Sequence, residues 1–107
     1  MRSVHALPID LPRARLRRFC EKWRIAEFAL FGSVLRPDFG PASDIDVLVT
    51  WAPGAEWSIL DHLRMEKELG EILGRPTEIV SRRAVEEAGN WIRTREIFST
   101  AWKVAVA

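Results

Sequence analysis

Two aspartates separated by one residue are the side chains in this sequence with the clearest chemical potential. Asp44 and Asp46 open the run D-I-D-V-L-V-T, and an extended backbone would place both on one face. Carboxylates this close repel each other unless a cation lies between them. Magnesium binds one or two carboxylates together with substrate phosphates. The pair therefore predicts a magnesium site at the beginning of a strand.

A glycine and a serine upstream have the character of a phosphate-binding turn. Gly32 and Ser33 follow the short apolar segment 25–31, which reads as a strand, and 33–36 could form one helical turn. Backbone N–H groups at such a turn point toward an anion, and Gly32 has no Cβ to obstruct it. The Ser33 hydroxyl and the Arg36 guanidinium can donate further hydrogen bonds to phosphate. Arg36 is equally well interpreted as an ordinary surface arginine.

The two groups together form a recognisable signature. Gly32-Ser33, ten intervening residues and Asp44-Ile45-Asp46 resemble the G-S-x10-D-x-D pattern of minimal nucleotidyltransferases in the DNA polymerase β superfamily. The resemblance continues through Phe31, Arg36, Ser43, 47–49, 77–80 and 92–104. It implies a polymerase β-like nucleotidyltransferase fold, with Asp44 and Asp46 as catalytic magnesium ligands.

The family also uses a third carboxylate on a neighbouring strand, for which the corresponding residue is Glu78. The resemblance implies that Glu78 binds a second magnesium ion and helps to activate the attacking hydroxyl. The family pattern would favour Asp at this position, and the longer Glu puts the geometry of the second ion in doubt. The alternative interpretation is that Glu78 is an exposed residue that solvates a strand edge.

The resemblance further implies a reaction and a partner. Minimal nucleotidyltransferases of this kind are antitoxins of HEPN ribonuclease toxins, and some transfer AMP from ATP to a toxin tyrosine. The sequence has no tyrosine, so a modified tyrosine must belong to a partner protein. Two alternatives remain: a non-catalytic antitoxin that acts by binding, and an aminoglycoside-type enzyme that modifies a small molecule as a homodimer.

The apolar pattern predicts the elements that must position these residues. We expect the order helix, strand, loop, strand, helix, strand, helix in one domain spanning 1–107. This is an α/β (α+β) fold with a small mixed sheet and helices packed against it. The second helix begins after Ser58 and carries apolar Leu60 and Leu63 among others, and the last runs from about Trp91 to Val104.

Composition narrows the classes of function. The 16 basic and 15 acidic residues leave a net charge of +1, so no global field favours direct binding of nucleic acid. One cysteine, Cys20, excludes an internal disulfide, and its apolar neighbours indicate packing. No signal peptide or membrane-spanning run is visible, which predicts a cytoplasmic protein without a membrane role. His5 and His62 lack partners at metal-ligand spacing.

Five tryptophans are many for 107 residues. Trp23, Trp91 and Trp102 lie on predicted helical stripes and are expected to fill the core. Trp51 and Trp57 flank a loop near the two aspartates, which favours a role in an interface or in stacking on a base.

Overall fold

The computed structural model describes residues 11–35, 40 and 43–104, and of Ser33 the backbone alone. A mixed sheet has the strand order β3-β2-β1-β4, with β1 antiparallel to β2 and β4, and β2 parallel to β3. The expected α+β class is confirmed. The bounds of the strands are β1 Ile25–Phe31, β2 Ile45–Trp51, β3 Thr77–Ser81 and β4 Trp102–Val104. The bounds of the helices are α1 Arg13–Lys22, α2 Ile59–Leu73, α3 Arg82–Glu87 and α4 Trp91–Thr100.

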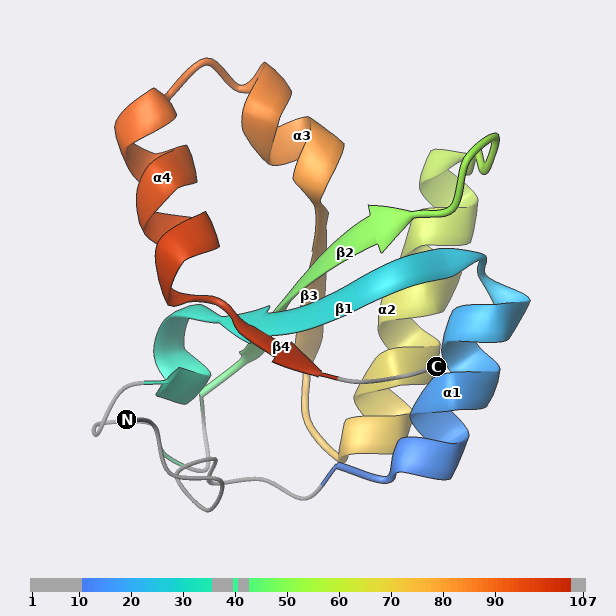
Figure 1. Cartoon of the computed structure of the whole chain (residues 1–107). Coiled ribbons are helices and arrows are strands. Elements are labelled where there is room, and N and C mark those ends of the chain that lie inside the picture. The colour runs from blue at the N-terminus through green and yellow to red at the C-terminus, as the bar shows by residue number, and fades with distance from the viewer. Residues whose placement is uncertain (1–10, 36–39, 41–42, 105–107) are drawn as a thin grey trace.

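The helices lie in two groups on opposite faces of the sheet (Figure 1). The face toward α1 and α2 carries the larger core, to which β2 contributes Ile45, Val47 and Val49. The face toward α3 and α4 carries a smaller cluster that includes Leu48. Successive residues of β2 thus point to opposite faces of the sheet, which confirms the predicted alternation.

The ends of α2 follow the local rules of helix capping. The Ser58 hydroxyl accepts a hydrogen bond from the Asp61 N–H at 3.1 Å, and the Asp61 carboxylate accepts one from the Ser58 N–H at 3.1 Å. Gly74 ends the helix in the left-handed region at φ 74°, which a side chain disfavours. This C-terminal cap delivers the chain to the start of β3, beside the beginning of β2.

The predicted helix from Trp91 to Val104 is wrong in its last turn. The helix ends at Thr100, Ala101 is extended at ψ 138°, and the chain continues as β4. Val104 pairs with Phe28 of β1 and is 3% exposed. Pairing with β1 gives the backbone N–H and C=O groups of this segment hydrogen-bond partners and buries the β-branched side chain of Val104. These contributions outweigh the apolar spacing of the segment, which also fits a helix.

Three apolar side chains of the predicted helices are exposed. Trp91 is 69% exposed at the first turn of α4, so its predicted place in the core is wrong. Leu60 and Leu63 on α2 are also exposed, and the buried residues of this helix are Met65 and Leu69. Trp23 is buried as expected, and Trp102 is half-buried on β4.

Candidate functional site

The carboxylate of Asp46 lies against the backbone of Gly32. Asp46 is opposite Phe31 in the β1–β2 register, and Gly32 follows Phe31 at φ 73°. A Cβ built on Gly32 would lie 2.5 Å from Asp46 Oδ2 and 3.3 Å from its Cγ. The glycine expected at a phosphate-binding turn is therefore also what allows an aspartate to stand beside that turn.

The turn after β1 has the predicted helical character. Gly32–Leu35 forms a 3-10 helix, and Val34 within it is buried against the larger core. The predicted phosphate ligands Gly32 and Ser33 are the first two residues of this turn. The Ser33 side chain and Arg36 lie outside the described residues, so their predicted contacts with phosphate stay predictions.

Asp44 and Asp46 bracket a buried residue at the start of β2. Ile45 has no exposed surface and packs in the core toward α1 and α2. Asp44 is exposed and Asp46 is half-buried. Burial of Ile45 thus holds the two acids away from the larger core, at the end of the sheet where the Gly32 turn lies.

The sheet places Glu78 beside Asp46. β3 is parallel to β2, and the register pairs Asp46 with Glu78 and Leu48 with Val80. Paired residues in neighbouring strands have side chains on the same face, so Glu78 shares a face with Asp46. Glu78 is exposed, and β3 is at the edge of the sheet. This position fits a metal ligand and equally fits the alternative interpretation, in which Glu78 solvates a strand edge.

The carboxylates of Asp44 and Asp46 suit a magnesium ion whose remaining ligands come from a nucleotide. Asp44 and Asp46 offer hard oxygen ligands from one short segment, and magnesium needs only one or two carboxylates when phosphates complete its shell. Among the described residues, no group of three or more histidine, cysteine, aspartate or glutamate side chains is arranged to hold a metal ion. The carboxylate pair of Asp44 and Asp46 fits an ion that is shared with a nucleotide.

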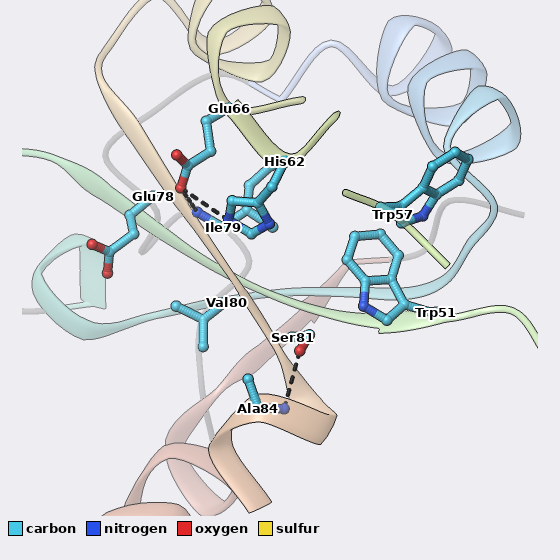
Figure 2. A pocket seen from close by; sticks show the side chains of 9 residues that line it. All are labelled: Trp51, Trp57, His62, Glu66, Glu78, Ile79, Val80, Ser81 and Ala84. Carbon is cyan, nitrogen blue, oxygen red and sulfur yellow. Dashed lines mark hydrogen bonds and ion pairs between the residues drawn. The ribbon is translucent and has the colours of Figure 1, made fainter. Parts of the chain in front are cut away.

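A cavity of about 480 Å³ wraps around the exposed edge of β3, close to Glu78. Figure 2 shows its lining, in which α2 and the tryptophans stand on one side and the start of α3 on the other. The lining residues are Trp51, Trp57, His62, Glu66, Glu78, Ile79, Val80, Ser81 and Ala84. A substrate bound there would contact both faces of β3.

Two polar residues of this cavity were missed by sequence reasoning. Glu66 Oε2 accepts a hydrogen bond from the Ile79 N–H at 2.8 Å and lies 3.5 Å from His62 Nε2 (Figure 2). His62 lines the same cavity. The only signal in the sequence was the i, i+4 spacing of His62 and Glu66, which is common on helices.

The tryptophans near the site have mixed roles. Trp57 stacks edge to face on the buried Trp23, with ring centroids 5.2 Å apart, and on Trp51 at 6.5 Å. Trp51 and Trp57 pack against the larger core and also line the cavity. They are therefore partly core residues, which the expectation of an interface or stacking role did not include.

Comparison with known proteins agrees with the geometry. Residues 13–104 match the family model described as a nucleotidyltransferase domain. A proposed protein adenylyltransferase from Methanocaldococcus jannaschii is 33% identical over 64 residues, which cover 60% of this chain and 67% of that protein.

Solved structures are similar in fold. The structure of a proposed minimal nucleotidyltransferase has a TM-score of 0.62 at 27% identity, covering 87% of each chain. A toxin–antitoxin structure with AMP-PNP has a TM-score of 0.68 at 14% identity, covering 91% of this chain and 75% of that chain. A MntA–HpeT toxin–antitoxin structure has a TM-score of 0.66 at 12% identity, with the same shares of the two chains.

The family match over residues 13–104 covers the segment from Gly32 to Asp46 and the strand that carries Glu78. The chain belongs to the nucleotidyltransferase family and is similar in fold to its minimal members.

Proposed function

We propose that the chain transfers AMP from ATP to a hydroxyl group on a partner protein, in a magnesium-dependent reaction. The observation that carries this proposal is the contact between the Asp46 carboxylate and the Gly32 turn, because it joins the predicted metal ligand to the predicted phosphate site. The proposal is also supported by similarity to a proposed protein adenylyltransferase.

Each residue has a distinct task in this reaction. Backbone N–H groups of the turn from Gly32 hold the triphosphate, and the Ser33 hydroxyl adds a donor. Asp44 and Asp46 would hold magnesium, which when bound neutralises the charge that develops on the phosphate oxygens. The acceptor oxygen forms a bond to the α-phosphorus, the bond from that phosphorus to the bridging oxygen breaks, and pyrophosphate leaves.

Glu78 is suited to the acceptor side of the reaction. Its carboxylate is exposed beside Asp46, at the cavity around the β3 edge. A carboxylate there would accept the proton of the attacking hydroxyl, or would hold a second magnesium ion that lowers the pKa of that hydroxyl. The acceptor would then enter from the β3 edge, while the nucleotide occupies the side of the Gly32 turn.

The partner that we propose is a toxin of the HEPN type, which would present the acceptor hydroxyl. Solved toxin–antitoxin complexes are among the structures with the same fold. The chain contains no tyrosine, so tyrosine modification would require the partner.

The test is transfer of label from α-labelled ATP, with magnesium, to candidate partner proteins. We expect label with the wild-type chain and a loss on the order of 100-fold with Asp46→Asn, since one ligand charge is removed. Glu21→Gln is the control, because Glu21 is exposed on α1 and is not among the residues that line the cavity around the β3 edge. Equal transfer by the wild-type chain and Asp46→Asn would exclude the assigned role.

A second candidate function is neutralisation of the partner by binding alone. It is favoured by Glu78 in place of the family's Asp. If the double variant Asp44→Ala, Asp46→Ala silences the partner as well as the wild-type chain does, neutralisation depends on occlusion. If neutralisation is lost while the complex remains, transfer is required.

A further inference from the structure

The residue before Asp44 is tied to a distant arginine at the end of α2. Arg75 Nη1 donates a hydrogen bond to the Gly40 carbonyl at 2.6 Å and lies 3.5 Å from the Ser43 carbonyl. Gly40 and Ser43 are also joined to each other, because the Ser43 N–H donates to the Gly40 carbonyl and the Gly40 N–H donates to Ser43 Oγ. Arg75 therefore holds both of these residues through one guanidinium group.

The residue after Asp44 is held by the neighbour of this arginine. The Ile45 N–H donates to the Pro76 carbonyl at 3.0 Å. Two consecutive residues, Arg75 and Pro76, thus fix the chain on each side of Asp44. Glu78 follows three residues after Arg75, on β3. The short segment 75–78 therefore positions the backbone around Asp44 and also carries Glu78.

Arg75 is itself held in place by the cap of α2. Its N–H donates to the Gly70 carbonyl at 3.1 Å, and its carbonyl accepts a hydrogen bond from Thr77 Oγ1 at 3.0 Å. A Cβ on Gly70 would lie 3.0 Å from the same Arg75 carbonyl oxygen, so the helix approaches this backbone closely. The guanidinium therefore projects from a well-defined backbone position.

We propose that Arg75 is a positioning residue of the transfer site, acting through the backbone around Asp44. Asp44 and Asp46 repel each other before a cation binds, so their placement needs support from the chain that carries them. Both contacts come from one nitrogen, Nη1, at the rigid planar end of the arginine side chain, and the flexible stem of lysine would not hold its ammonium at the same place. This role rests on the proposed function, since it assigns Asp44 to the metal.

The test compares Arg75→Lys and Arg75→Ala with the matched changes Arg64→Lys and Arg64→Ala on the exposed face of α2. The first readout is amide hydrogen exchange at Ser43 and Ile45, which needs no activity. We expect faster exchange at both amides in the Arg75 variants and no change in the Arg64 variants. Unchanged exchange at both amides in Arg75→Ala would overturn the proposal.

The second readout is the dependence of transfer on magnesium. For Arg75→Lys we expect kcat to fall about 10- to 100-fold, with a higher magnesium concentration at half-maximal rate, since a small displacement of a ligand has effects of this size. A global loss of folding would lower Tm and activity without altering the magnesium requirement, and that result would refute a positioning role. If the wild-type chain transfers no label, the proposed function fails, and the exchange experiment alone decides the role of Arg75.

Discussion

Two features of the structure require a glycine at position 32: a left-handed backbone and a close approach of the Asp46 carboxylate. The φ of 73° at Gly32 disfavours any side chain, and the Asp46 carboxylate occupies the space that a Cβ would need. The spacing in the sequence predicted that Gly32 and Asp46 belong to one site. It did not predict their direct contact, which depends on the pairing of Phe31 with Asp46 between β1 and β2.

Replacement of Gly32 by alanine tests the second of these features. We expect Gly32→Ala to reduce transfer on the order of 100-fold, because the new Cβ displaces the Asp46 carboxylate, which we propose as a magnesium ligand. We also expect a loss of about 1 to 2 kcal/mol in the free energy of unfolding from left-handed strain. The measurements are the rate of label transfer and chemical unfolding.

Gly54→Ala supplies the matched control. Gly54 has φ 81°, and nothing lies within 4 Å of a Cβ built on it. The variant should therefore lose similar stability and keep its transfer rate. If the two variants lose the same activity, strain alone explains the effect and the contact with Asp46 has no role.

Among the elements, β4 is where local sequence and final structure differ most. The apolar residues from Trp91 to Val104 fit a helical stripe, yet the last three described residues pair with β1. A Lys103–Glu27 ion pair at 2.9 Å joins the same strands and lowers the pKa of Glu27. This outcome depends on an available edge of β1, which no local window of sequence contains.

A pair of substitutions tests this assignment. Val104→Ala should cost about 1 to 3 kcal/mol in the free energy of unfolding, because Val104 is buried on β4. Trp91→Ala should change it by less than about 0.5 kcal/mol, because the larger side chain is mostly exposed. Urea unfolding measures both. A larger loss for Trp91→Ala would contradict the described packing of α4 and β4.

For the whole molecule, the buried Cys20 links stability to pH. Burial raises the pKa of its thiol from 9.0 to about 11. The unfolded thiol therefore ionises at lower pH than the folded one, and the unfolded state gains stability as pH rises from about 9 to 11. We expect a loss of roughly 2 to 3 kcal/mol in the free energy of unfolding over this range.

Unfolding of the wild-type chain and of Cys20→Ala at several pH values isolates this effect. Lysine titration is common to both proteins, so the difference between their curves reports on the thiol. The wild-type curve should fall more steeply between pH 9 and 11. Parallel curves would show that Cys20 ionises equally in both states.

The helices of the molecule differ in length and in how much apolar surface they expose. Within the part of the chain described, no helix has the length and apolar character needed to cross a membrane. Exposed apolar residues occur at the start of α2, at Ile59, Leu60 and Leu63, and at the start of α4. Of these residues, Trp91 was expected in the core from helical periodicity, which reports the face of a helix and not whether another element covers it.

The sequence by itself determined the family signature, the turn at Gly32 and the common face of Asp44 and Asp46. These features depend on residue types and on the two-residue period of a strand, which are local. Only the tertiary structure decided that Glu78 stands beside Asp46, that Arg75 reaches Gly40 and that β4 completes the sheet. Each of these joins residues far apart in the chain, and such contacts are selected by burial and backbone pairing across the whole fold.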